Sequence, residues 1–124
     1  MLYLHRFISA FVFTEIVEVV GLFLFFRYFF SRKEIRWMEI IFTGFFASFS
    51  TIPYVWFVFP FIINWSYSLY IIISELFALI IEAVLYHYFL KLDWKMAFLV
   101  SFLCNLASFL LGSVLQLYGI WIYW

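Results

Sequence analysis

Four glutamates stand inside stretches of the chain that are otherwise apolar, and they are the residues best suited to chemistry. Glu15 and Glu18 lie in the first such stretch, and Glu75 and Glu82 lie in the third. A carboxylate at the centre of a bilayer costs roughly 2.5 kcal/mol or more, so a residue of this kind usually faces a bundle interior, a watery cavity or a partner. Helical spacing puts Glu15 and Glu18 on one face, and Glu75, Glu82 and Tyr86 on one face of another helix. We therefore treat these carboxyl groups as candidate functional groups.

Hydroxyl and amide side chains recur in the second and fourth apolar stretches. Stripes of this kind let membrane helices approach closely and hydrogen-bond to one another, which is the structural alternative to a functional role. Asn105 has four hydrogen-bonding positions and needs matched partners in apolar surroundings. The predicted cation-binding or proton-carrying residues are Glu15, Glu18, Glu75, Glu82 and Asn105. The predicted supporting residues are Ser48, Thr51, Ser101, Ser108 and Tyr86.

No basic residue lies at the depth predicted for the glutamates, because every lysine and arginine stands near the end of an apolar stretch. Either the carboxyl groups carry protons, or a cation from outside the chain lies among them. The candidates for that cation are a proton, sodium, a divalent metal, an organic amine and a basic residue of another subunit. A carboxylate-bridged di-metal site would need Glu-x-x-His motifs, which are missing here, whereas an oxygen-only site stays open, so the metal is unknown. The single cysteine, Cys104, excludes an internal disulfide and a cysteine-based zinc site.

The composition requires a membrane around these residues. The chain has 124 residues, of which 69% are hydrophobic and 11% are charged, and a soluble domain of this length does not bury so much apolar surface. An apolar run of about 20 residues crosses the hydrocarbon core. The sequence therefore predicts four membrane spans, at about residues 7–26, 37–59, 65–86 and 96–118. Pro53 inside the second span predicts a kink or a hinge.

The basic residues are distributed unequally between the two ends of these spans. Arg6 stands alone at one end. The other end holds Arg27, Arg32, Lys33, Arg36, Lys91 and Lys95. The positive-inside rule then predicts a multi-pass protein of the cell membrane with its basic loops in the cytoplasm and both termini outside. The formal net charge is zero, and nothing in it indicates nucleic-acid binding.

A weak internal repeat suggests how the spans are paired. A shift of 57 residues aligns the two halves without a gap, placing Glu18 on Glu75 and Ser48 on Asn105. We predict one all-α transmembrane domain over residues 1–124. Its four helices form an antiparallel bundle of two related hairpins, at about residues 7–60 and 65–118. Parallel repeats occur in transporters with a site at the repeat interface, but tandem duplication also occurs in proteins that transport nothing.

Two segments resemble parts of small prokaryotic integral membrane proteins. One combines an acidic helix, a basic turn and a helix with an Asn-x-x-Ser/Thr pattern, and the other is the stretch TIPYVW at 51–56. The residues of the first segment that carry the resemblance are Glu75 through Glu82, Ala97, Ser101, Asn105, Ser108 and Gly112. The resemblance covers about half of the chain and implies no particular activity.

The leading functional hypothesis is the binding or translocation of a proton or cation at a carboxylate site near the membrane midplane. One alternative is a non-catalytic subunit or scaffold whose buried glutamates pair with a partner helix. A second alternative is an intramembrane acid-base enzyme acting on a lipid. Under the leading hypothesis we expect no enzymatic activity and no cofactor beyond a bound cation. The expected partners are the lipid bilayer and either further copies of the chain or a membrane complex. A single bundle of four helices leaves little room for a translocation pathway of its own.

Overall fold

The computed structural model describes residues 2–29 and 34–118. Within these ranges the chain is helical and has no strand. The elements are α1 (Leu2–Leu24), its π-helical continuation η1 (Phe25–Phe29), α2 (Trp37–Phe57), the short α3 (Phe59–Ile62), α4 (Tyr67–Phe89) and α5 (Trp94–Leu117). Two of the residues used for the topology prediction, Arg32 and Lys33, lie outside the described residues.

Four helical segments in the described ranges are long and apolar enough to cross a membrane. They are Leu2–Tyr28, Trp37–Ile62, Tyr67–Phe89 and Trp94–Leu117, with mean hydropathies of 2.1, 1.6, 2.1 and 2.1. The predicted all-helical class is thereby confirmed, as is the prediction of four helices long and apolar enough to span a membrane. The first helix begins at Leu2 rather than near residue 7, because the apolar residues ahead of Arg6 continue the helix.

Side-chain caps determine where α4 and α5 begin. Asp93 accepts a hydrogen bond from the Met96 amide at 3.0 Å, so α5 begins at Trp94 rather than at residue 96. Ser66 accepts a longer hydrogen bond from the Leu69 amide, at 3.4 Å, ahead of α4. Polar residues in the two connections thus set the register of the helices that follow them.

Two prolines affect the second span differently. Pro53 lies inside α2, and the helix continues through it. Pro60 lies in the first turn of α3, just after the end of α2. Pro60 has no N–H, so the Trp56 carbonyl lacks the donor that a continuous helix would provide. The Tyr3 hydroxyl of α1 donates to that carbonyl instead. This contact ties the start of α1 to the end of α2.

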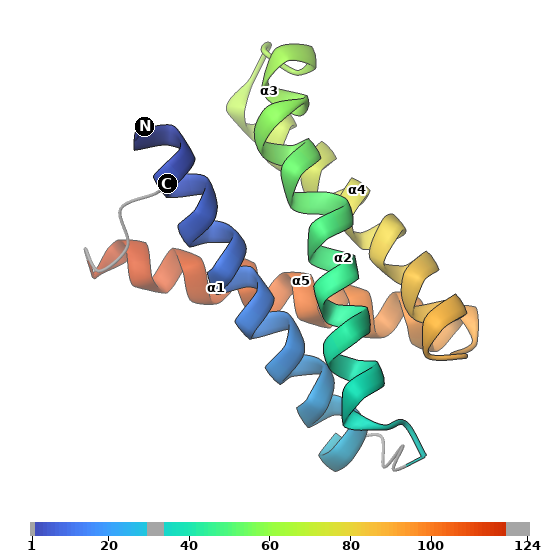
Figure 1. Cartoon of the computed structure of the whole chain (residues 1–124). Helices are drawn as coiled ribbons and strands as arrows, with labels where there is room; N and C mark the ends of the chain where they lie inside the picture. The colour runs from blue at the N-terminus through green and yellow to red at the C-terminus, as the bar shows by residue number, and fades with distance from the viewer. Residues whose placement is uncertain (1, 30–33, 119–124) are drawn as a thin grey trace.

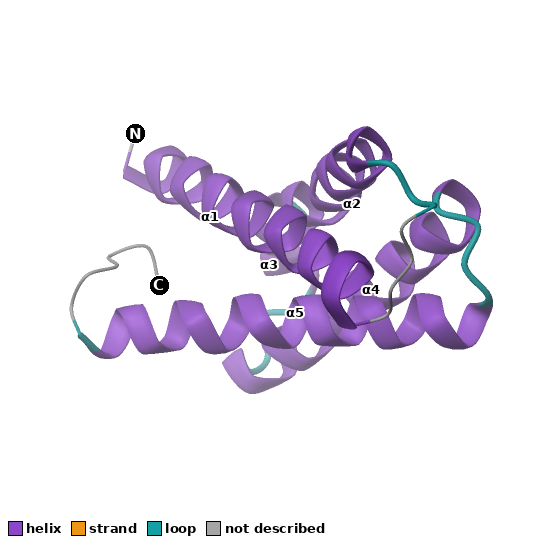
Figure 2. Cartoon of the chain, turned by 90° about the horizontal axis from the view of Figure 1, so that it is seen from below, coloured by secondary structure: helices purple, strands orange, loops and turns teal. Residues whose placement is uncertain are grey.

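The four long helices form a closed ring. Helix α1 packs against α2 and α5, and α4 packs against the same two helices. Figure 1 shows α1 and α2 in front and α4 and α5 behind, with α5 crossing behind the others at a steep angle. In Figure 2, α1 crosses over α5, which it contacts. The interior of the ring is therefore lined by one face of each long helix.

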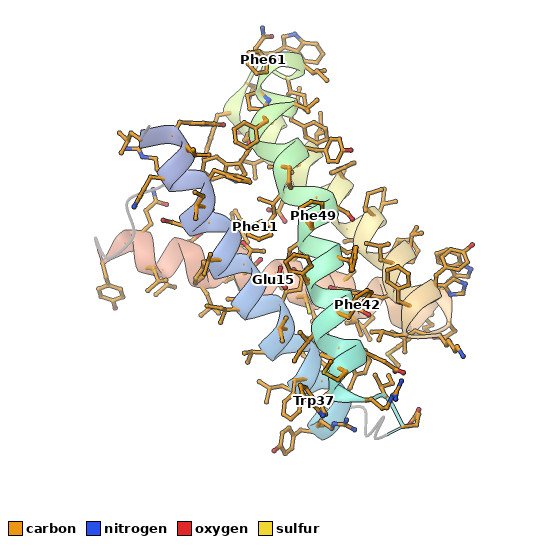
Figure 3. All side chains as sticks on the ribbon, viewed as in Figure 1. Phe11, Glu15, Trp37, Phe42, Phe49 and Phe61 are labelled. Atoms are coloured by element: carbon orange, nitrogen blue, oxygen red, sulfur yellow. The ribbon has the colours of Figure 1, made fainter. Side chains whose placement is uncertain are left out.

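Helix α2 and the short α3 direct several large phenylalanine side chains outward, whereas the inner face of α2 carries small or polar residues. Phe42 and Phe49 of α2 point away from the ring, as does Phe61 of the following α3 (Figure 3). All three side chains are exposed. The buried face of α2 carries Thr43, Gly44, Ala47, Ser48 and Thr51. Lipid is as apolar as a phenylalanine ring, so nothing drives these rings inward, and small residues let the helices approach closely. This arrangement brings polar groups on neighbouring helices within reach of one another.

Candidate functional site

Two glutamates from different helices meet in the middle of the bundle. Glu18 of α1 and Glu82 of α4 are 2% and 1% exposed, and their carboxyl groups lie close enough to each other to share a hydrogen bond. A hydrogen bond between two carboxyl groups requires that at least one of them carries a proton. Two like charges at this separation, shielded from water, would repel strongly. The pair therefore holds at least one proton.

Hydroxyl groups surround Glu18. The Tyr86 hydroxyl of α4 donates to Glu18 Oε1, and the Ser48 hydroxyl of α2 donates to Glu18 Oε2 at 3.4 Å. Tyr86 and Ser48 are fully buried. Hydrogen bonds to a carboxylate favour its charged form, so these donors suit Glu18 to be the ionised member of the pair.

An amide holds the other side of Glu82. Asn105 of α5 donates from Nδ2 to Glu82 Oε2 at 2.6 Å and also to the Ser101 carbonyl at 2.8 Å. The Thr51 hydroxyl lies 3.5 Å from Glu82 Oε1 but only 3.0 Å from the Ala47 carbonyl, which is its better acceptor. Helices α2 and α5 therefore contribute polar groups around Glu82 of α4, while α1 supplies Glu18.

The remaining two glutamates flank this pair without joining it. Glu15 lies one turn before Glu18 and faces α2 (Figure 3), with its carboxyl group near Ser48. One of its oxygens, Oε2, is buried without a partner. Glu75 forms no hydrogen bond within the described part of the chain. Sequence reasoning placed Glu75 at the depth of Glu18, whereas the carboxyl group that contacts Glu18 belongs to Glu82, two turns further along α4.

Two of the predicted supporting residues satisfy backbone groups. Ser101 donates to the Leu79 carbonyl of α4 at 2.8 Å, which ties α5 to α4. Ser108 donates to the carbonyl of Asn105 at 3.1 Å, within its own helix. Neither hydroxyl contacts a carboxyl group in these hydrogen bonds. Their positions match the packing role that the sequence left open for the hydroxyl stripes.

An inner cavity of about 110 Å³ adjoins the carboxyl pair. Its polar wall residues are Thr14, Thr51, Tyr70, Ser74, Glu75, Glu82, Asn105 and Ser108. Since a water molecule takes about 30 Å³ of liquid volume, the cavity has room for several waters or one small cation. Sequence reasoning missed Tyr70 and Ser74 as wall residues, although Ser74 directly precedes Glu75.

The cluster has no internal counter-charge. None of the described lysine, arginine or histidine side chains contacts the carboxyl groups of Glu15, Glu18, Glu75 or Glu82. The described residues also contain no group of three or more histidine, cysteine, aspartate or glutamate side chains placed to hold a metal ion.

No family model, curated protein or solved structure matches this chain. The resemblance to small prokaryotic membrane proteins therefore stays a prediction and carries no activity to it. What the cluster does has to follow from its own chemistry.

Proposed function

We propose that this membrane protein binds or translocates a proton or a small cation at the carboxyl pair of Glu18 and Glu82. The observation that carries the proposal is a buried pair of acids from two helices, beside a cavity with polar side chains in its wall and without a basic partner among the described residues. Maintaining such groups in a bilayer is costly, and a purely structural contact would be made more cheaply by hydroxyl groups. The proposed role is not enzymatic and needs no cofactor.

Exchange at the pair follows from its charge. With one proton, the pair carries a single negative charge, which Tyr86 and Ser48 stabilise on Glu18. A cation entering the cavity next to Glu82 favours loss of the remaining proton, because two carboxylates then share its positive charge. The proton leaves through water in the cavity. Return of the proton releases the cation, so the two ligands compete for one site.

Proton release tests this mechanism directly. Purified protein in weakly buffered detergent solution receives sodium, magnesium or a primary alkylamine, and a pH indicator records released protons. We expect up to one proton per chain with at least one of these cations. Release should be lost in Glu82→Gln and retained in Glu39→Gln, since Glu39 forms only an exposed ion pair with Arg36. Folded wild-type protein that releases no proton with any of the three cations contradicts the proposal.

Orientation and assembly belong to the same proposal. The end of the bundle opposite α3 carries Arg27, Arg36, Lys91 and Lys95, and the positive-inside rule assigns such an end to the cytoplasm. Both termini are then outside, and the 57-residue repeat relates the two hairpins. Protease protection of tags at either terminus in sealed spheroplasts tests this orientation. Tags that are protected from added protease contradict it.

One observation supports a partner-binding role as a second candidate. Glu75 lines the inner cavity and also a groove of about 360 Å³ between α4 and α5, whose other residues are mostly apolar. A basic residue on a partner helix, or on another copy of the chain, would find an unpaired carboxylate there. We expect Glu75→Gln to dissociate such an assembly in mild detergent while proton release at Glu82 persists. An assembly of unchanged size removes this candidate.

A further inference from the structure

Two hollows of the bundle share a wall. The inner cavity ends at Trp56 and Tyr70, and these two residues also line a second hollow of about 420 Å³ at the end of the bundle that holds α3. We call this second hollow the vestibule. It is lined further by polar residues of the connection after α3, including Asn64, Ser66 and Tyr67. Among the described residues, only Trp56 and Tyr70 therefore line both hollows.

The partition between the two hollows is held by specific contacts. The Tyr70 hydroxyl of α4 donates to the Val55 carbonyl of α2 at 2.7 Å. The Trp56 ring packs against Tyr3 and Phe7 of α1, with ring centroids 5.3 and 6.1 Å apart. Tyr70 is half-buried and bridges two helices through a single hydrogen bond. Loss of that bond would free the ring to turn away from α2.

A polar group without a partner lies just inside the partition. Ser74 follows Tyr70 by one helical turn, is 5% exposed and lines the inner cavity. It lies close to the Tyr70 hydroxyl, but that hydroxyl donates to Val55, and Ser74 Oγ itself forms no hydrogen bond. Buried hydroxyl groups are normally satisfied by protein or by water. Ser74 is thus suited to bind a water molecule that enters past Tyr70.

At the opposite end of the bundle the buried Thr43 and a hollow of about 250 Å³ with Glu34, Glu39 and Lys91 in its wall lie beside a layer of large apolar side chains. That layer includes Leu22, Phe26, Ile40, Leu90 and Leu92, all at most 5% exposed. They belong to one hydrophobic cluster. Passage of a hydrated ion through this layer would strip its water without providing polar replacements.

We propose that water and small cations reach the carboxyl pair from the α3 end of the bundle, past the Trp56–Tyr70 partition, and that Tyr70 controls this access. Ser74 is the first water-binding group inside. This route rests on the proposed function only for the identity of the transported ligand, because access along the route can be measured without transport. With the orientation proposed above, this entrance faces the outside of the cell.

Thiol labelling measures the route. Ser74→Cys is introduced into a Cys104→Ala background, and the protein is reconstituted into sealed vesicles whose orientation is established by a protease-sensitive N-terminal tag. The probe is a small, positively charged methanethiosulfonate that does not cross bilayers. We expect labelling from the side that carries the N-terminus, because Tyr3 of α1 contacts Trp56 at the α3 end. Ala78→Cys, at another cavity wall position, serves if Ser74→Cys does not fold.

The role of Tyr70 is tested by the rate of labelling. One hydrogen bond stabilises the closed partition by about 0.5–1.5 kcal/mol, so Tyr70→Phe should raise the rate about twofold to tenfold. Tyr67→Phe changes a vestibule residue that does not line the inner cavity, and its rate should match that of the parent.

Three results overturn this inference. They are labelling from the basic end, an unchanged rate in Tyr70→Phe, and labelling only by an apolar, membrane-permeant maleimide. The last result would indicate entry from lipid through the groove between α4 and α5. Because labelling requires no exchange of ligand, the route can stand while proton release fails, and proton release can stand while the route fails.

Discussion

Replacing Glu82 with glutamine should leave the bundle nearly as stable as the wild type. Glutamine has almost the same shape as glutamate, and its amide group both donates and accepts hydrogen bonds. Its NH₂ group can donate to Glu18, and its carbonyl oxygen can accept from Asn105, so both principal hydrogen bonds of Glu82 are retained. We expect the free energy of unfolding to fall by less than about 1 kcal/mol.

Replacing Glu82 with alanine removes both of these hydrogen bonds. A side-chain hydrogen bond between membrane helices contributes about 0.6 kcal/mol on average and up to about 1.7 kcal/mol. Two lost bonds therefore cost about 1–3 kcal/mol, and the space left by the shortened side chain adds to this cost. We expect a total loss of about 2–4 kcal/mol. Reversible unfolding of the purified protein in mixed micelles, with increasing mole fraction of a denaturing detergent, measures the difference between the two variants.

Infrared spectroscopy follows the proton in the same variants. A protonated carboxyl group has a C=O stretching band that is separate from the bands of carboxylate and amide groups, and this band shifts in D₂O. We expect its intensity to fall in Glu82→Gln, because Glu18 then accepts from an amide and no longer shares a proton. Glu39→Gln is the control, since Glu39 lies outside the buried cluster. The reasoning is refuted if glutamine destabilises as much as alanine at position 82, or if the band in Glu82→Gln equals that of the wild type.

Three further variants, one of them a control, test the helix packing and the start of α5 by the same unfolding assay. A Cβ at Gly44 would lie 2.9 Å from Cγ2 of the stiff Val19 side chain, whereas one at Gly21 would meet nothing closer than 3.5 Å. Gly44→Ala should therefore cost about 1–3 kcal/mol and Gly21→Ala should cost nothing; equal effects would contradict the close approach of α1 and α2. Asp93→Ala should cost about 1 kcal/mol by removing the cap on the Met96 amide, and hydrogen exchange of that amide should accelerate. Unchanged exchange there would show that the cap does not form.

Sequence patterns predicted the helices and the polar faces because both depend on local periodicity. Apolar runs long enough to cross a bilayer stand out in any window of about 20 residues. The boundaries were less accurate, since α1 begins ahead of Arg6 and α5 begins at its Asp93 cap. The ends of a helix depend on one or two side chains, and averaging hydropathy over a window of many residues hides their effect.

The partners of each polar residue were harder to predict. Glu75 and Glu82 share a face of α4 and differ by two helical turns, so the face alone does not indicate which of them meets Glu18. The steep crossing of α5 also brings Asn105 to Glu82 (Figure 1). Tyr86 was expected as a supporting residue, and it donates directly to Glu18.

The sequence by itself determined that this chain folds into helices long and apolar enough to span a membrane, with acids on the inner faces of the first and third, because water and lipid sort side chains by type and spacing. Only the tertiary structure decided that Glu18 contacts Glu82, that Glu75 stands apart beside a cavity, and that Tyr70 separates this cavity from the vestibule. These outcomes depend on the crossing angles and relative heights of helices distant in sequence. Close packing of small side chains sets both, and no single helix encodes them.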